Sequence, residues 1–256
     1  LWGVDAQAEA RNRLNWIDLP KASRDLLPQL DALSAWARSK NLTNFILCGM
    51  GGSSLAPEVI AQTYGKKVFI LDSTDPDYLA HALTGSPADL LVIVSSKSGS
   101  TIETSSQRAF FEGYLTSAKL DPTAHILFVT DPGSPLDIDV RAKGYAVINA
   151  DPKVGGRFSA LTAFGLTPAT LMGVDASILL DQAGDLRSQL AQNPVTALDV
   201  AYLLLTQNEQ FLGFTDHGSN FPGLSDWIEQ LIAESTGKQE VGRLPIATEG
   251  FSQAQS

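Results

Sequence analysis

Hydrophobic and polar positions follow two different patterns along the chain. In residues 1–40 apolar residues recur at three- and four-residue spacing, which predicts two amphipathic helices. The residues that set this spacing are Ala10, Leu14, Ile17, Leu26, Leu30, Leu33 and Trp36. From residue 44 onward, short apolar runs without alternation predict strands that are covered on both faces. These runs are residues 44–49, 67–72, 89–95, 125–131 and 145–150.

Longer amphipathic stretches separate the runs and predict helices over residues 54–65, 75–85 and 101–119. Strands that alternate with helices are typical of an α/β fold built on a doubly wound parallel sheet with flanking helices. After residue 150 the alternation breaks, and three helices are expected over 160–172, 175–192 and 195–208. A strand over 210–216 and a helix over 224–238 follow, which predicts an incomplete second α/β domain.

These patterns divide the chain into three parts. Residues 1–40 form a helical segment, residues 41–150 a complete α/β domain, and residues 151–256 the connecting helices with the start of a second domain. The chain has 256 residues, of which 44% are hydrophobic and 18% charged, so it can bury a large core or two smaller ones. We therefore expect a globular protein.

Charge and hydropathy exclude some classes of partner. The formal net charge is −10, and no cluster of lysines and arginines is present, which argues against nucleic-acid binding. No run approaches the roughly 18 apolar residues of a membrane span. The single cysteine, Cys48, lies within an apolar run and is expected to be a small core residue. We expect a cytoplasmic protein that does not bind membranes.

The ends of the chain suggest a fragment. The sequence opens on Leu1 without an initiator methionine, and it closes on the polar residues 248–256 without a further predicted element. We expect the natural chain to continue.

A cluster of hydroxyl side chains follows the third predicted strand. Ser96, Lys97, Ser98, Gly99, Ser100 and Thr101 form the turn into a helix, where free N–H groups and the helix dipole favour an anion. The alternative, a run of helix-capping residues, explains one or two of these side chains but not the whole cluster. The loop is therefore predicted to bind phosphate.

A glycine-rich turn follows the first predicted strand. Gly49, Gly51 and Gly52 let backbone amides approach an anion, and Ser53 and Ser54 can cap the next helix or donate hydrogen bonds. An ordinary tight turn with a serine N-cap explains the same residues equally well, because a single glycine-rich turn is a weak motif.

Dinucleotide binding is a minor alternative for this turn. Asp72 ends the second predicted strand 20 residues after Gly52, where it could contact a ribose hydroxyl. However, Ser54 occupies the position of the third glycine in that fingerprint, and the hydroxyl loop would then have no role.

Two further groups carry candidate chemistry. Arg157 follows a Gly-Gly turn, a suitable place for a guanidinium that faces developing negative charge. Gln230 and Glu234 are four residues apart and therefore share one face of a predicted helix. Spacing alone favours a solvated helix face for this pair.

Taken in order, the segments GMGGSSLAP, SSKSGSTIET, GGRFSALTAFG and QLIAESTGK resemble the successive signatures of the phosphoglucose isomerase family, whose domains have the sugar isomerase fold. The last two are specific to that family, whereas the first two also resemble other sugar-phosphate isomerase domains. Residues 1–20 are similar to bacterial members, some of which are fused to transaldolase. The resemblance implies an enzyme that interconverts glucose 6-phosphate and fructose 6-phosphate, without cofactor or metal, as a homodimer.

The resemblance also implies a role for each candidate residue. Those that would hold the substrate phosphate are Ser96, Lys97 through its backbone, Ser98 and Thr101, and those that would line the sugar are Gly52 and Ser53. Arg157 would stabilise the enediolate and Gln230 would position the phosphorylated hexose. Glu234 would be the general base.

Some expected parts are missing from the sequence. The ring-opening histidine and a C-terminal lysine of the family lie beyond the end of this chain, and His81, His125 and His217 match neither position. We therefore expect weak sugar-phosphate binding and negligible isomerase activity from these 256 residues alone. A non-catalytic sugar-phosphate sensor, which needs no base, and a scaffold protein are the alternatives.

Overall fold

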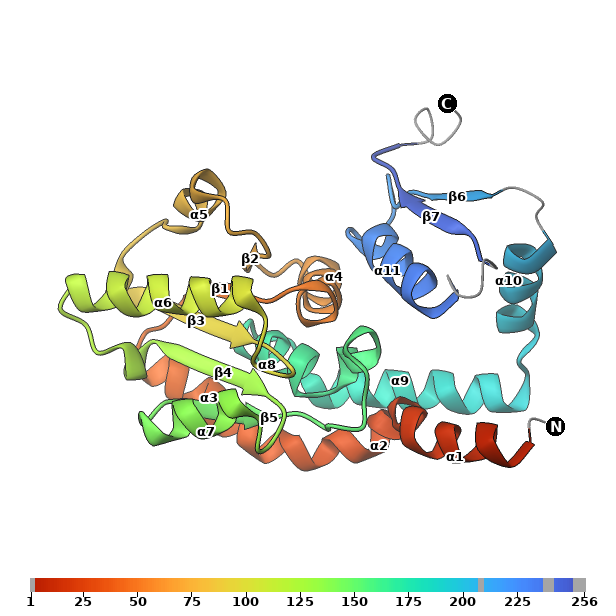
Figure 1. Ribbon diagram of the computed structural model, residues 1–256, viewed down its shortest axis with the longest axis horizontal. Helices are drawn as coiled ribbons and strands as arrows, with labels where there is room; N and C mark the ends of the chain where they lie inside the picture. Colours follow the sequence, from red (N-terminus) through yellow and green to blue (C-terminus); the bar gives the residue numbers. More distant parts are fainter. Residues whose placement is uncertain (1–2, 207–209, 237–241, 251–256) are drawn as a thin grey trace.

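The computed structural model describes residues 3–206, 210–236 and 242–250. Its larger part is a parallel sheet of five strands flanked by helices (Figure 1). The strands are β1 (Asn44–Cys48), β2 (Phe69–Leu71), β3 (Leu90–Ser95), β4 (Ile126–Thr130) and β5 (Ala146–Asn149). All five predicted strands are present, so the expected α/β fold with a parallel sheet is confirmed.

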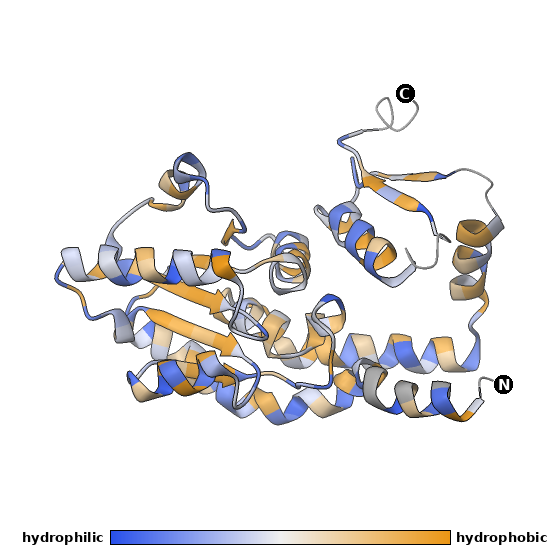
Figure 2. Ribbon diagram, viewed as in Figure 1, coloured by the Kyte–Doolittle hydropathy of each residue, from blue (hydrophilic) through white to orange (hydrophobic). Residues whose placement is uncertain are grey.

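Helices cover both faces of this sheet, as the unbroken apolar runs predict. On one face, strand residues such as Leu47 and Ile93 pack against α3 (Leu27–Ser39) and α8 (Ala163–Leu171). On the other face, neighbouring residues such as Ile46 and Val92 pack against α5, α6 and α7. These helices span Pro76–Ala82, Ile102–Ser117 and Pro135–Ala142. Every residue of β3 and β4 is buried, and both strands are mostly hydrophobic in Figure 2.

The strand order is β2-β1-β3-β4-β5. The chain leaves β1 to build β2 on one side and returns to build β3 on the other, so the connections that follow β1 and β3 diverge. In an open parallel sheet, such a reversal leaves a crevice at the carboxyl ends of the two strands. The glycine-rich turn and the hydroxyl loop both begin at this point.

The N-terminal 40 residues form more elements than the spacing predicts. They are α1 (Gly3–Arg13), the 3₁₀ helix η1 (Asn15–Asp18), α2 (Leu19–Ala22), the 3₁₀ helix η2 (Ser23–Leu26) and α3. The predicted second helix thus begins at Leu27 rather than near Ser23. Pro28 lies in the first turn of α3, where its missing N–H removes no intrahelical hydrogen bond.

The remaining helices belong to the sheet, to the connection after it or to a smaller second unit. They are α4 (Leu55–Thr63), α9 (Ala176–Gln192), α10 (Val195–Thr206) and α11 (Leu224–Thr236), with 3₁₀ turns η3 (Gly51–Ser53), η4 (Pro87–Asp89), η5 (Pro122–Ala124) and η6 (Gly156–Leu161). The predicted ends of the helices over 195–208 and 224–238 lie outside the described residues. The division of the chain at residues 40 and 150 stays a prediction.

The second unit contains two parallel strands, β6 (Phe211–Phe214) and β7 (Leu244–Ala247), with α11 between them in sequence. These elements form one β-α-β unit, in which β7 was not predicted, and a second α/β domain stays a prediction. Apolar side chains are exposed on α10 and on these strands, including Tyr202, Leu205 and Phe211. Within the described parts of the chain, no helix combines the length and the apolar character needed to cross a bilayer.

Candidate active site

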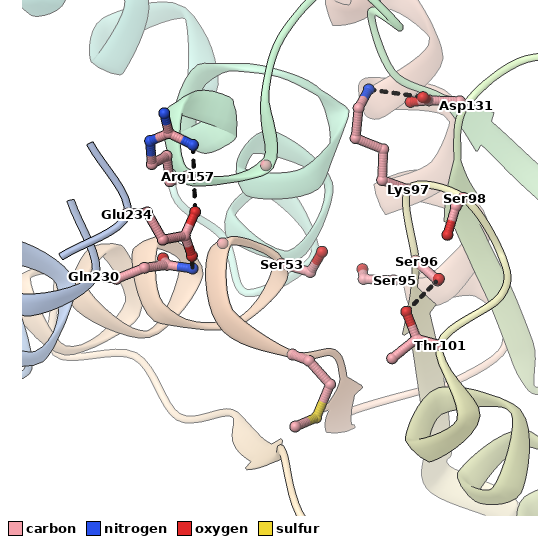
Figure 3. Close-up of a pocket in the computed structure, with 13 residues that line it drawn as sticks. Ser53, Ser95, Ser96, Lys97, Ser98, Thr101, Asp131, Arg157, Gln230 and Glu234 are labelled. Atoms are coloured by element: carbon pink, nitrogen blue, oxygen red, sulfur yellow. Dashed lines mark hydrogen bonds and ion pairs between the residues drawn. The ribbon is translucent and has the colours of Figure 1, made fainter. Parts of the chain in front are cut away.

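A cavity of about 460 Å³ lies beyond the carboxyl ends of β1 and β3 (Figure 3). The structure brings all the site residues predicted from the sequence to this one cavity. They are Gly52, Ser53, Ser96, Lys97, Ser98, Thr101, Arg157, Gln230 and Glu234. Gly52 and Glu234 therefore line the same cavity, although they are 182 positions apart in the sequence.

Four more residues line the cavity and were not singled out from the sequence: Met50, Ser95, Asp131 and Gly156. Ser95 is the last residue of β3, and Asp131 directly follows β4. Because β3 and β4 are parallel neighbours, their carboxyl ends meet at the same edge of the sheet. A polar residue at the end of each apolar run in the sequence is the signal that could have identified Ser95 and Asp131.

The hydroxyl loop is held in shape by its own side chains. Ser96 Oγ accepts a hydrogen bond from the Gly99 amide at 3.1 Å and contacts Thr101 Oγ1 at 3.3 Å. Ser98 Oγ contacts Ser100 Oγ at 2.7 Å. Gly99 has a φ of +74° and its Cα faces Leu136 so closely that a Cβ has no room. Some of these hydroxyls therefore shape the loop, as the capping alternative assumed.

The loop nevertheless keeps the features of an anion site. Thr101 occupies the N-cap position of α6, a helix of 16 residues, but its side chain makes no capping hydrogen bond to that helix. Ser96, Lys97, Ser98 and Thr101 all face the cavity. A bound anion here lies at the positive end of the helix dipole and within reach of hydroxyl donors.

Lys97 and Asp131 form an ion pair at the edge of the cavity. Lys97 Nζ lies 2.6 Å from Asp131 Oδ2 and also donates to the Pro152 carbonyl at 3.2 Å. The Asp131 amide and Thr130 Oγ1 both donate to the Lys97 carbonyl, each at 3.2 Å. Burial raises the pKa of the Asp131 carboxyl, and the Lys97 ammonium offsets part of that rise. The ammonium is therefore turned away from the hydroxyls of its own loop.

The glycine-rich turn serves close packing. A Cβ added at Gly52 would lie 2.8 Å from the Arg157 amide nitrogen and closer still to the Gly156 carbonyl. This contact places η6 against η3 and brings Arg157 to the cavity. Ser54 lies at the N-cap position of α4, but its hydroxyl donates to the Gly51 carbonyl at 3.1 Å and makes no cap.

These contacts bear on dinucleotide binding, because η6 occupies the space beside the glycine-rich turn where a pyrophosphate would need to approach the backbone. Asp72 does not line the cavity. The structure therefore does not favour the dinucleotide alternative.

Arg157, Gln230 and Glu234 form a hydrogen-bonded group on the opposite wall from the hydroxyl loop (Figure 3). Glu234 Oε1 accepts from Gln230 Nε2 at 2.9 Å, and Glu234 Oε2 lies 3.3 Å from Arg157 Nη1. Arg157 Nε also donates to Ser235 Oγ at 3.0 Å, a contact that the sequence did not reveal. The Glu234 side chain is 47% exposed, so it both faces the cavity and contacts solvent.

Three buried polar atoms of the cavity lining have no hydrogen-bond partner within the described chain: Ser95 Oγ, Asp131 Oδ1 and Gln230 Oε1. Buried polar groups are usually paired, because an unpaired one costs about 1–3 kcal/mol. The cavity is thus suited to an occupant with several hydroxyl groups. The described residues contain no group of three or more His, Cys, Asp or Glu side chains that could hold a metal ion.

Comparisons with known proteins find glucose-6-phosphate isomerases among the sequences similar to this chain. The chain is 28% identical to a glucose-6-phosphate isomerase of Carboxydothermus hydrogenoformans over 98% of its own length and 60% of the relative's length. It is 30% identical to a glucose-6-phosphate isomerase of Thermus thermophilus, with 95% of this chain and 61% of the relative covered. The chain therefore spans about three fifths of the length of these curated relatives.

A solved structure gives the same result for the fold. The crystal structure of a glucose-6-phosphate isomerase from Chlamydia trachomatis superposes with a TM-score of 0.78 at 22% identity, covering 99% of this chain and 52% of that one. At this identity the likeness shows a shared fold. No family model matches the chain.

Proposed function

We propose that this chain belongs to the glucose-6-phosphate isomerase family, as its similarity to curated members supports, and that its complete protein interconverts glucose 6-phosphate and fructose 6-phosphate. The observation that carries the proposal is that one cavity combines an anion-binding loop with a carboxylate and a guanidinium on the facing wall. An aldose-ketose isomerase needs these parts: an anchor for the phosphate, a base beside the carbon acid and a cation for the oxyanion.

The phosphate is held by the hydroxyl loop in this proposal. Ser96, Ser98 and Thr101 donate through their side chains and Lys97 through its backbone amide. The Lys97–Asp131 ion pair supports this assignment, because the ammonium is engaged at 2.6 Å and neutral donors are left to face the anion. Gly52 and Ser53 then lie along the sugar chain.

Glu234 acts as the general base. In linear glucose 6-phosphate it removes the proton from C2, and the electron pair moves toward O1 to give an enediolate. The hydroxyl proton of O2 passes to O1, the proton held by Glu234 is returned to C1, and the electron pair left on O2 forms the C2 carbonyl of fructose 6-phosphate. Arg157 stabilises the negative charge on the oxygens while Gln230 orients the Glu234 carboxylate, as its 2.9 Å hydrogen bond supports.

Substitution of the base tests the catalytic assignment. In the complete protein, Glu234→Gln should abolish turnover in an assay coupled to glucose-6-phosphate dehydrogenase and leave binding of 6-phosphogluconate nearly intact. Asp185→Asn removes an exposed carboxylate of α9 that does not line the cavity and serves as the matched control. Unchanged turnover in Glu234→Gln excludes Glu234 as the base. It would favour a sugar-phosphate sensor, for which this carboxylate has no use.

Soaking tests the phosphate assignment separately. Crystals of this chain soaked with sulfate or a 6-phosphosugar should show the anion in the loop of Ser96 to Thr101. An anion bound at another position in the chain contradicts the assignment. If no sugar phosphate raises the melting temperature of the complete protein, a scaffold role becomes the better explanation.

The chain alone should bind sugar phosphate weakly and isomerise it negligibly. None of His81, His125 and His217 lines the cavity, so the described lining residues include no histidine to open the sugar ring. Loss of one general acid or base typically costs about 10²- to 10⁴-fold in rate. Turnover by the purified chain at a rate near that of the complete protein would contradict this. We expect the complete protein to be a homodimer, which light scattering on the eluting protein measures.

A further inference from the structure

The guanidinium of Arg157 lies against an aromatic ring. Its Cζ atom is 4.7 Å from the centre of the Phe158 ring. The Phe158 ring in turn stacks on Trp16 of η1, with ring centres 5.2 Å apart and planes inclined by 13°. A residue of the N-terminal segment therefore contacts the ring that carries the proposed catalytic arginine, although 141 positions separate Trp16 from Arg157 in the sequence numbering.

The N-terminal segment makes polar contacts with α9 and η6 near Trp16, and among them the hydrogen bond of the buried Ser23 to η6 is the one shielded from solvent. Asp18 Oδ1 pairs with Arg187 Nη2 of α9 at 2.6 Å, and Arg24 pairs with Asp181 of the same helix. Ser23 Oγ donates to the carbonyl of Leu161, the last residue of η6. The segment thus bridges α9 and η6, so the position of Trp16 is set by more than its own stacking contact.

The ion pair of the Arg157 guanidinium with Glu234 is less suited to hold it through the reaction, and its hydrogen-bond partner Ser235 is exposed to solvent. The Glu234 side chain is 47% exposed, and an exposed ion pair contributes little fixed geometry. Moreover, Glu234 becomes neutral when it takes the substrate proton, which is the step at which the enediolate charge develops. The ion pair is therefore lost when Arg157 is most needed, whereas an aromatic support carries no titratable group and keeps its place.

We propose that Trp16 is a positioning residue, which stacks on Phe158 and so holds the Arg157 guanidinium where it faces the reacting end of the substrate. This inference rests on the function proposed above. It gives the N-terminal segment a part in catalysis without contact to substrate. Because the hydroxyl loop lies on the opposite wall, removal of the Trp16 ring should impair turnover and leave phosphate binding unchanged.

Four variants of the complete protein test this. Trp16→Ala removes the ring, Trp16→Leu keeps apolar bulk without a flat surface, and Trp16→Phe restores a ring. Phe110→Ala is the matched control, because Phe110 has the same 37% exposure and stacks on Tyr114 of α6, away from the cavity. For each variant we would measure kcat, KM and the affinity for inorganic phosphate.

We expect Trp16→Ala and Trp16→Leu to lower kcat by about 10- to 100-fold, since a shift of about 1 Å in a catalytic group costs up to about 10²-fold. KM and phosphate affinity should stay within about twofold. Trp16→Phe should recover most of the rate, and Phe110→Ala should match the wild type. Should Trp16→Ala fail to fold, Trp16→Leu carries the test.

Wild-type kcat in Trp16→Leu overturns the proposal, as does a loss that Trp16→Phe does not recover. A wild-type protein that binds phosphate but turns over no hexose phosphate refutes the proposed function instead. In that event a crystal structure of Trp16→Leu still tests the positioning role of Trp16. If the Arg157 guanidinium lies where it does in the wild type, the positioning role is overturned.

Discussion

Gly52 is the position at which a single methyl group should disturb the site most. A Cβ there would lie 2.8 Å from the Arg157 amide nitrogen and within the contact distance of the Gly156 carbonyl. These are backbone atoms, so no rotation of a side chain can relieve the clash. In Gly52→Ala, η6 has to move away from η3 by about 1 Å to restore ordinary van der Waals separation.

The movement has two measurable consequences. Overpacking of this kind costs about 1–3 kcal/mol of the free energy of unfolding. For a chain of this size, each kcal/mol lowers the melting temperature by about 2–4 °C, so the expected decrease is about 2–12 °C. Because Arg157 moves with η6, the complete protein should also lose about 10²-fold in kcat.

Gly155→Ala is the matched control for this experiment. Gly155 precedes η6 with φ of −65° and ψ of 149°, which any residue adopts. A Cβ there would meet only the Phe158 ring, at 3.8 Å. Thermal unfolding followed by circular dichroism should separate the two variants clearly. Equal melting temperatures and equal turnover for both variants would refute the close approach of η6 to Gly52.

Three further changes have defined outcomes. Gly113→Ala, at an exposed interior position of α6 where a Cβ meets nothing within 4 Å, should raise the free energy of unfolding by about 0.5–1 kcal/mol in urea titrations. Burial raises the pKa of the Asp131 carboxyl in the folded state. The folded protein therefore binds the carboxyl proton more tightly than the unfolded chain does. Loss of this proton as the pH rises lowers the free energy of unfolding. The stability of Asp131→Asn relative to wild type should therefore improve as the pH rises above about 4, the ordinary pKa of an aspartate, and a constant difference would contradict the raised pKa. Cys48 is fully buried and its thiol pKa is raised by burial, so a thiol reagent should modify it only after unfolding.

The sheet could be predicted because burial on both faces leaves an unambiguous mark on the sequence. β3 and β4 are buried at every position, and so no polar residue interrupts their runs. β7 was missed because it is four residues long and contains Pro245, which is disfavoured within strands. α7 was missed because only Leu136 and Val140 among its apolar residues are buried, too few to set a helical period.

The residues of the candidate site also fall into two groups, those that the local sequence indicates and those that only the folded chain reveals. Most residues found from the sequence lie in loops or turns whose polar or glycine-rich composition differs from their surroundings, whereas Gln230 and Glu234 lie on α11 and were found from the family resemblance. Asp131 requires the strand order, since its relation to Lys97 follows from the pairing of β3 with β4. Ser235 and Trp16 could not be found, because contacts between residues that distant in the chain leave no trace in local spacing.

The two walls of the cavity also come from different stretches of the chain. The hydroxyl loop and Asp131 belong to the five-stranded unit, whereas Gln230 and Glu234 lie on α11. During synthesis at about 5–20 residues per second, Glu234 leaves the ribosome about 5–20 s after Asp131. The proposed phosphate loop can therefore form before the chain carries the proposed base. Under the proposed function, ligand binding precedes catalysis in the life of each molecule, and sugar phosphate stabilises the newly made N-terminal part while the C-terminal part is still being translated.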